Sequence, residues 1–220
     1  MLSIVLTGAA LLSGSKNAAL PEKDIDGTIF LVNRQHVISE QYVPEPLRKT
    51  QVYGMSQSMR EDAATALEEL FQAAQADGIK LSSVSGYRSY SKQSLIYSRK
   101  VGRTGSEAEA DKLVARPGAS EHQLGLAMDL ATRNSSTLSE KFGSTPEGQW
   151  VYANCQRFGF IVRYLKGYED VTGYSFEPWH IRYVGPEHAE AIAASGLPFE
   201  TYLSGWKLEL YDYLLHHAMN

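Results

Sequence analysis

Cysteine is nearly absent from the sequence, since Cys155 is the single one. No disulfide can therefore form within the chain, and disulfides give no indication about secretion. A lone cysteine is also a candidate nucleophile, but Cys155 lies in the aromatic-rich stretch "WVYANCQRFGF". Free cysteine is among the most buried residue types, so we expect Cys155 to be a small buried hydrophobic residue rather than a catalytic thiol.

Dense runs of lysine and arginine are missing as well. The chain carries 21 Lys and Arg against 25 Asp and Glu, which gives a formal net charge of -4. Proteins that hold nucleic acid through its phosphates present a basic surface. The charge balance therefore argues against nucleic acid as a partner.

The sequence has no apolar run long enough to cross a bilayer, which takes about 20 apolar residues. The apolar stretch Leu2–Leu12 is shorter and instead resembles the hydrophobic region of a secretory signal. The small residues Ala18 and Ala19 follow it, but no Lys or Arg precedes it. We expect residues 1–28 to form a hydrophobic leader or membrane anchor followed by a polar linker.

The rest of the composition is that of an ordinary globular protein. Hydrophobic residues make up 43% and charged residues 21% of the 220 residues, which is enough apolar material for a sizeable core. We expect one folded, monomeric domain over residues 29–204. The tail over residues 205–220, "WKLELYDYLLHHAMN" with the residue before it, is predicted to form a C-terminal amphipathic helix.

Predicted helices and strands follow one another without a regular βαβ alternation. The clearest helix spans residues 56–76, where apolar residues recur at steps of three and four and Ser56 or Ser58 can cap the start. Further helices are predicted over 89–102, 103–115, 145–160 and 185–196, and strands over 28–33, 79–89, 125–131, 161–165 and 179–185. This mixture favours an α+β fold over a doubly wound sheet.

The predicted strand "GLAMDLA" (125–131) carries an aspartate at its centre. By the alternation of a strand, Ala127 and Asp129 share one face and the larger apolar residues share the other. A carboxylate in such a place is costly unless it is paired or binds a metal. His122 lies shortly before this strand, so the two residues are candidates for half of a metal site.

A second polar pair, Glu177 and His180, stands at the start of the apolar segment "WHIRYVG". We expect His180 and Arg182 on one face of this strand, and Pro178 to keep Glu177 out of the regular strand. Two histidines and one carboxylate are a typical ligand set for Zn²⁺ that leaves a position for water. A further carboxylate can accept the proton of that water. Each pair alone is a weak signal, because buried histidines are more often hydrogen-bonded core residues.

Three segments together resemble the motif blocks of the VanY-type D-alanyl-D-alanine carboxypeptidases. They are "SGYRSYSKQ" (85–93), "ARPGASEHQLGLAMDL" (115–130) and "EPWHIRYVG" (177–185). These zinc peptidases share a fold with the sonic hedgehog signalling domain. The resemblance therefore implies a central, mainly antiparallel sheet flanked by helices. One departure is Leu124, where many relatives carry Thr, and it touches no proposed ligand.

The resemblance also implies the catalytic roles. His122, Asp129 and His180 would bind one zinc ion, and Glu177 would be the general base and acid. The water that attacks the scissile carbonyl would come from the position that these ligands leave open. Residues 29–204 would then be the zinc carboxypeptidase domain.

Three further matches imply contacts with the substrate. Arg88 matches an arginine that holds the substrate and stabilises charge at the scissile carbonyl, Ser120 a serine associated with the terminal carboxylate, and Gln93 a glutamine of the cleft. A carboxypeptidase must recognise a free carboxylate, which calls for guanidinium or hydroxyl donors. The sequence leaves open which of Arg88 and Ser120 meets the carboxylate.

The implied function is a zinc-dependent D,D-carboxypeptidase that removes the C-terminal D-alanine from peptidoglycan stem peptides, in the bacterial cell envelope or secreted. The same residues would also serve an L,D-carboxypeptidase acting on tetrapeptide stems, an endopeptidase or a dipeptidase. That choice depends on loops such as 163–175. A non-catalytic, zinc-containing cell-wall binding module is the alternative of another class. Glu177, Arg88 and Ser120 argue against it, because a structural zinc site needs none of them.

Overall fold

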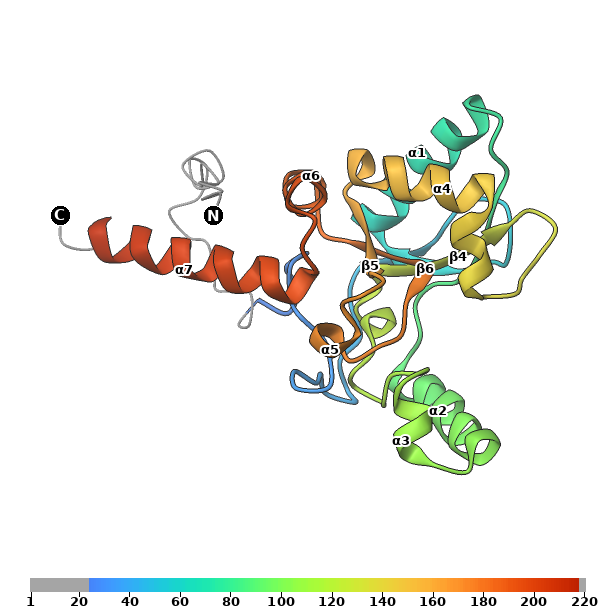
Figure 1. Ribbon diagram of the computed structural model, residues 1–220, viewed down its shortest axis with the longest axis horizontal. Helices are drawn as coiled ribbons and strands as arrows, with labels where there is room; N and C mark the ends of the chain where they lie inside the picture. The colour runs from blue at the N-terminus through green and yellow to red at the C-terminus, as the bar shows by residue number, and fades with distance from the viewer. Residues whose placement is uncertain (1–23, 218–220) are drawn as a thin grey trace.

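A four-stranded antiparallel sheet with the strand order β3-β4-β6-β5 forms the centre of the protein (Figure 1). The computed structural model describes residues 24–217, with side chains up to Leu208. The strands of the sheet are β3 (Leu81–Ser85), β4 (Ala127–Thr132), β5 (Phe160–Tyr164) and β6 (Glu177–Tyr183). Helices lie on both sides of the sheet, which confirms the expected α+β class.

A small ribbon of β1 (Leu47–Lys49) and β2 (Ser58–Arg60) precedes the first helix. The helices are α1 (Glu61–Ala76), α2 (Tyr90–Thr104), α3 (Glu107–Asp111), α4 (Pro146–Asn154), α5 (Glu169–Thr172), α6 (Pro186–Ser195) and α7 (Phe199–His217). Short 3₁₀ turns are η2 (Glu121–Leu124), η3 (Glu140–Ser144) and η4 (Cys155–Phe158). Helices α1 and α4 lie on one side of the sheet, and α2 and α3 lie beyond the other (Figure 1).

Strand alternation gives the sheet one apolar and one mixed face. Met128 of β4 and Ile181 of β6 join the main core together with Leu67 and Leu70 of α1. The neighbouring residues along β4 and β6 point to the opposite face. Asp129 is one of them, so the expected division of this strand is confirmed.

The register of β4 and β6 places Asp129 directly opposite His180. On the other side of β4, Ser85 of β3 pairs with Asp129. Side chains of directly opposed residues on one face lie about 5 Å apart at Cβ. The sheet therefore brings together residues that are far apart in the sequence.

Two predicted strand features are wrong. Residues 28–33 form no strand, and the carbonyl oxygens of Thr28 and Phe30 instead accept hydrogen bonds from Arg182, both at 2.9 Å. Glu177 lies inside β6 despite Pro178. Pro178 is tolerated because β6 there extends past its pairing with β4, and its pairing with β5 is irregular, so no regular ladder bond is lost.

The predicted boundaries of the first long helix are also wrong. Helix α1 begins at Glu61, because residues 58–60 pair with β1 instead. Neither Ser56 nor Ser58 caps it, since the residue before the helix is Arg60 and no side chain caps the end. Asp62 and Glu61 place negative charge in the first turn, which favours the positive end of the helix dipole.

Helix α7 begins at Phe199, earlier than the expected boundary at residue 205. Phe199, Tyr202 and Leu203 are buried in a second apolar cluster with residues of α6, whereas Leu208 is 72% exposed. Beyond this first part the helix projects from the body (Figure 1). Among the described residues, no helix has the length and apolarity that a membrane span requires. The expected leader falls within residues 1–23, which lie outside the described part.

Candidate active site

The turn η2 positions His122 at one end of the sheet. It ends at Gly125, whose φ of 69° is a left-handed conformation that favours glycine and turns the chain into β4. The Nδ1 atom of His122 lies 2.8 Å from the carbonyl oxygen of Gly86. Because a carbonyl can only accept, Nδ1 carries the hydrogen, and the lone pair of Nε2 faces the site.

His122, Asp129 and His180 offer three ligand atoms within 4.8 Å of one another. His122 Nε2 lies 3.4 Å from Asp129 Oδ2, and His180 Nδ1 lies 3.1 Å from Asp129 Oδ1. All three side chains are buried. The structure therefore brings the three predicted ligands together.

This donor set fits a zinc ion. Among the buried polar atoms without a hydrogen-bond partner are His122 Nε2 and Asp129 Oδ1. Buried polar atoms are rarely left unpaired, so unpaired ligand atoms that converge are suited to hold a cation. Two imidazoles and one carboxylate suit Zn²⁺ and leave a fourth position open.

The two histidines have different ionisation behaviour. Burial lowers the pKa of His122 to about 4, and the positive charge of Arg88 acts in the same direction. Burial also opposes the charge on His180, but its contact with Asp129 raises its pKa to about 9. Burial raises the pKa of Asp129, but its contacts with the two histidines outweigh this and hold the pKa well below its usual range. Asp129 is therefore an ionised carboxylate at neutral pH.

Glu177 lies beside this group at the start of β6. Its Oε2 atom is 3.8 Å from His180 Nδ1. Burial raises the pKa of Glu177 to about 7; the charge of His180 lowers it and that of Asp129 raises it. A carboxyl group that gains and loses a proton near neutral pH is suited to general acid and base catalysis.

Arg88 points toward the same site from the loop after β3. Its backbone N–H donates to the carbonyl oxygen of His122 at 3.1 Å, which ties the loop to η2. The guanidinium is buried, and its Nε has no hydrogen-bond partner. Burial lowers the pKa of Arg88, while Asp129 and Glu177 counteract this. An unpaired buried guanidinium can bind a carboxylate or carbonyl oxygen.

A cleft of about 450 Å³ joins the predicted residues. Ser120 and Gln93 both line it, as do Arg88, Glu177 and the three candidate ligands. Gln93 donates from Nε2 to the carbonyl oxygen of Ala115 at 2.6 Å, and its buried Oε1 has no partner. The apolar part of the wall consists of Ile96, Leu113, Val114, Leu138, Phe176 and Trp179. All the residues expected at the site therefore share one cleft.

A buried ionic network next to the ligands is absent from the sequence-based prediction. The side chains of Glu121, Arg163 and Arg182 are 0% exposed, and Glu200 of α7 completes the group. Arg182, which follows His180 on β6, pairs with Glu121 at 2.9 Å. The sequence does contain a signal for such a network: an arginine lies within each of two apolar segments, Arg163 in "IVRYL" and Arg182 in "WHIRYVG". A buried arginine requires a buried acid.

Two other polar residues lie away from the site. Arg116, shortly before His122 in the sequence, pairs with Asp111 and Glu107. His188 is half-buried and its Nδ1 lies 2.9 Å from the hydroxyl of Tyr202. Neither residue belongs to the candidate active site.

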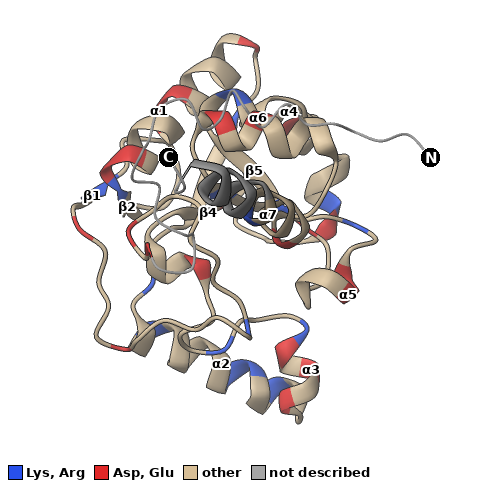
Figure 2. Cartoon of the chain, turned by 90° about the vertical axis from the view of Figure 1, so that its left-hand side faces the viewer, with Lys and Arg blue, Asp and Glu red and all other residues tan. Residues whose placement is uncertain are grey.

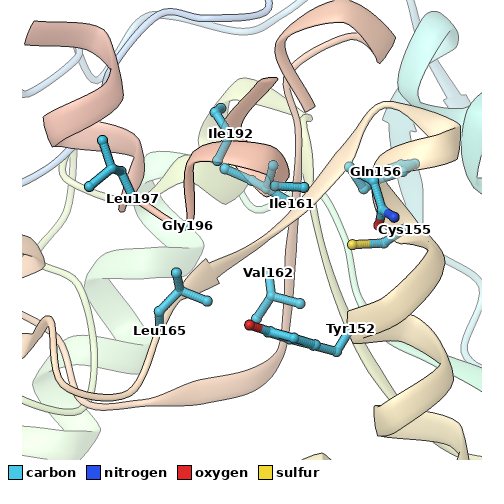
Figure 3. Close-up of a pocket in the computed structure, with 11 residues that line it drawn as sticks. Tyr152, Cys155, Gln156, Ile161, Val162, Leu165, Ile192, Gly196 and Leu197 are labelled. Atoms are coloured by element: carbon cyan, nitrogen blue, oxygen red, sulfur yellow. The ribbon is translucent and has the colours of Figure 1, made fainter. Parts of the chain in front are cut away.

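A second cavity lies between η4, β5 and the end of α6 (Figure 3). Its walls are mostly apolar, with Ile161, Val162 and Ile192 among them, and it holds about 230 Å³. Cys155 is buried at its edge, and burial raises the pKa of the thiol to about 12. The thiol is thus protonated at neutral pH, as expected for a buried hydrophobic residue.

Charges of both signs are mixed on the surface. Figure 2 shows acidic and basic positions close together on α2 and α3. The ion pairs at α3 include Lys112 with Glu109 at 2.7 Å and Arg116 with Asp111 at 2.8 Å. On this part of the surface, charges of opposite sign therefore lie side by side.

Comparison with known proteins identifies relatives over most of the chain. The model of the VanY D-alanyl-D-alanine carboxypeptidase family matches residues 56–186. A D-alanyl-D-alanine carboxypeptidase of Enterococcus faecalis (strain ATCC 700802 / V583) is 42% identical over 188 residues, which cover 80% of this chain and 66% of the relative. The chain thus spans slightly less than two thirds of that protein.

Solved structures give the same result. The LdcB LD-carboxypeptidase aligns with a TM-score of 0.77 and 42% identity, over 83% of this chain and 88% of that one. A mutant of the vancomycin-resistance D,D-pentapeptidase VanY, in complex with Zn(II), aligns with a TM-score of 0.70 and 38% identity, over 80% and 98%. These matches confirm the hedgehog-like peptidase fold and the resemblance inferred from the sequence. The chain belongs to the VanY family of D-alanyl-D-alanine carboxypeptidases.

Proposed function

We propose that the protein is a zinc-dependent D,D-carboxypeptidase that removes the C-terminal D-alanine from peptidoglycan stem peptides. The observation that carries the proposal is the convergence of His122, Asp129 and His180, with Glu177 beside them. The Zn(II) complex of the related VanY supports the choice of metal. One zinc ion would be held by these three ligands.

The bound zinc would polarise the scissile carbonyl and lower the pKa of water. Glu177, whose pKa burial raises, would accept the proton of the attacking water on a carboxylate oxygen and deliver it to the leaving amine. Arg88 would stabilise the negative charge that develops on the carbonyl oxygen, since its guanidinium is already desolvated. Ser120 and Gln93 would orient the end of the peptide.

A second specificity is supported by one observation. The LdcB LD-carboxypeptidase aligns with a higher TM-score and identity than the D,D-pentapeptidase VanY. An L,D-carboxypeptidase would use the same residues on a tetrapeptide stem. The segment 163–175, expected to shape the cleft, contributes Tyr164, Tyr174 and Ser175 to its wall.

Release of D-alanine from defined stem peptides tests the proposal. We expect the purified zinc-loaded protein to release D-alanine from a pentapeptide ending in D-Ala-D-Ala faster than from a tetrapeptide. The opposite ratio would establish the L,D specificity. Glu177→Gln should lower the rate by about 10²- to 10⁴-fold, the usual contribution of a general acid or base. The matched control is Glu140→Gln, because Glu140 is an exposed carboxylate that lines the same cleft and is none of the three candidate ligands.

Full activity of the Glu177→Gln protein would refute the mechanism. Tight zinc binding without hydrolysis of any stem peptide would instead establish the non-catalytic cell-wall binding module.

The proposal also covers the localisation and the oligomeric state of the protein. Peptidoglycan lies outside the cytoplasm, so we propose that the protein acts in the cell envelope or is secreted, with residues 1–28 as leader or anchor. We also propose that it acts as a monomer. Cell fractionation with and without residues 1–28 tests the first point, and size-exclusion chromatography with light scattering tests the second.

A further inference from the structure

The carboxylate of Glu121 is held on one side by two arginines. Its Oε1 atom accepts from Arg163 Nε at 2.7 Å and from Arg182 Nη1 at 2.9 Å. All three side chains are 0% exposed. Arginine has no acceptor and remains charged, so only an acceptor oxygen can occupy the position of Oε1.

The other carboxylate oxygen faces a candidate metal ligand. Glu121 Oε2 lies 3.5 Å from Nε2 of His180 and has no hydrogen-bond partner among the protein atoms. The opposite ring nitrogen, His180 Nδ1, faces Asp129 at 3.1 Å. The imidazole is therefore placed between a carboxylate outside the metal site and the site itself.

We propose that Glu121 is a positioning residue for the metal site. It accepts the hydrogen of His180 Nε2, which fixes the ring orientation and the tautomer whose Nδ1 lone pair is directed at the metal. The inference rests on the proposed zinc function. A carboxylate or carbonyl that holds the outer nitrogen of a ligand histidine commonly raises metal affinity.

The other candidate ligand histidine, His122, also has a partner at the ring nitrogen that faces away from the metal site. The Gly86 carbonyl holds Nδ1 of His122, which leaves Nε2 for the metal. Glu121 Oε2 faces Nε2 of His180 at 3.5 Å, and a hydrogen bond there would leave Nδ1 for the metal. The two histidines would thus bind through different nitrogens, each selected by its outer partner.

Helix α7 contributes the second carboxylate of the buried network. Arg163 donates from Nη1 and Nη2 to both carboxylate oxygens of Glu200, at 2.9 and 2.6 Å. Two carboxylates and two guanidinium groups therefore balance in charge inside the protein. Glu200 thereby neutralises Arg163, while Arg182 donates to Glu121 Oε1 without any contact to Glu200.

The variant Glu121→Gln gives a sharp test because an amide has one oxygen and one NH₂ group. The two arginines can accept nothing, so the amide oxygen must take the place of Oε1. The NH₂ group must then face His180 Nε2. Two N–H groups cannot hydrogen-bond to each other, so the variant disfavours the tautomer that binds metal through Nδ1.

The experiment compares zinc affinity, measured by competition with a chromophoric chelator, in three proteins. We expect Glu121→Gln to bind zinc about 10- to 100-fold more weakly than the wild type, the usual effect of losing an outer partner. Glu200→Gln is the matched control, because it removes a carboxylate from the same network without a contact to His180. It should bind zinc like the wild type.

Nitrogen-15 NMR of the zinc-loaded proteins provides a readout that a general loss of stability would not change. In the wild type we expect an N–H signal from His180 Nε2 and from His122 Nδ1. In Glu121→Gln the His180 signal should be lost and that of His122 retained.

Each outcome decides the proposal. Equal zinc affinity and an unchanged His180 signal in a folded Glu121→Gln protein would overturn it. An equal loss of affinity in Glu200→Gln would overturn it as well, since the effect would then belong to the whole network. If Glu121→Gln does not fold, Glu121→Asp decides, because it keeps the charge but withdraws the carboxylate from His180 and should also weaken zinc binding. A wild type that binds no zinc refutes the proposed function instead.

Discussion

At the scale of single residues, the site consists of buried polar side chains that the protein alone does not fully satisfy. Arg88 Nε, His122 Nε2 and Asp129 Oδ1 are buried in the site and have no hydrogen-bond partner among the protein atoms. Such groups destabilise the folded state unless a ligand or metal satisfies them. Two predictions concern single residues beside the candidate ligands: the effect of Glu177 on stability and the effect of Arg88 on catalysis.

The first prediction concerns the stability of the metal-free protein. Because the folded pKa of Glu177 is about 7, above its value of about 4.3 in unfolded chains, folding favours the protonated form. Its contribution to stability is full below pH 4 and is lost as the pH rises to about 7. Glu177→Gln should therefore be more stable than the wild type at pH 8, by about 1–3 kcal/mol, and equal at pH 4.

Chemical denaturation in chelator at both pH values measures this difference. Glu140→Gln, in the exposed rim of the cleft, is the control and should follow the wild type at both. If the stability of Glu177→Gln relative to the wild type is the same at pH 4 and pH 8, the raised pKa of Glu177 is contradicted.

The second prediction concerns Arg88. Lysine keeps the charge but loses the planar fork that matches a carboxylate or an oxyanion. We expect Arg88→Lys to lower kcat/KM about 10- to 100-fold, the effect of one charge-assisted hydrogen bond. Steady-state kinetics on a pentapeptide stem measures it, and Arg116→Lys, outside the cleft, is the control. Equal losses in the two variants would argue against a direct role of Arg88.

The candidate site could be predicted residue by residue because its polar groups interrupt apolar segments. Asp129 within "GLAMDLA" and His180 within "WHIRYVG" required an explanation, and the resemblance supplied it. Glu121 could not be assigned in this way. It stands at the start of the short turn η2, where a carboxylate is ordinary, and only the folded structure shows that it meets Arg163 and Arg182.

At the scale of elements, α7 belongs to the folded domain through its first turns. Phe199 and Leu203 are buried, and Glu200 binds Arg163 inside the protein. The side chain of Leu208 marks the change to an exposed helix. The stability of the domain should depend on the first part of this helix.

Two truncations test this dependence. A chain that ends after Leu197 loses the buried Phe199 and leaves Arg163 without Glu200, and we expect it to be at least about 3 kcal/mol less stable. A chain that ends after Leu208 keeps both contacts and should lose much less. Urea denaturation compares them, and equal midpoints for the two truncations would refute the structural role of the first turns.

Element boundaries were the least predictable part of the fold. The apolar period predicted the helix that became α1, but residues 58–60 pair with β1, and this pairing depends on a partner strand that no local pattern specifies. The same holds for residues 28–33, whose apolar sequence is typical of a strand. Their carbonyl groups bind Arg182 instead, which only the tertiary structure reveals.

At the scale of the whole molecule, zinc binding should be coupled to folding. The candidate ligands lie in η2, β4 and β6, so the unfolded chain has no such site. A ligand that binds only the native state at 100 times its Kd adds about 2.7 kcal/mol of stability. We expect the Tm to rise with zinc and fall with chelator.

The variant His122→Ala is the test of this coupling. It should show no rise in Tm with zinc, while Cys155→Ala, which also removes a buried potential metal ligand outside the site, should keep the rise. Differential scanning calorimetry measures both. A zinc effect that survives in His122→Ala would place the ion elsewhere.

The α+β class could be predicted for the whole molecule because helices and strands follow one another without regular βαβ alternation. The antiparallel sheet could be predicted because the three motif blocks resemble those of a known family. The choice between pentapeptide and tetrapeptide stems could not. It depends on the shape of a cleft whose walls come from segments as distant as Ile96, Leu138 and Tyr174. No single segment carries that information.

Because Asp129 and His180 are paired directly across β4 and β6, the metal site depends on the register of these two strands. A shift of β6 by one residue against β4 would turn His180 to the apolar face and remove it from the site altogether. A shift by two residues would keep the face but separate the two ligands by about 7 Å along the strand. Either shift would take the two ligands apart. Metal binding should therefore report whether β4 and β6 are paired in the native register.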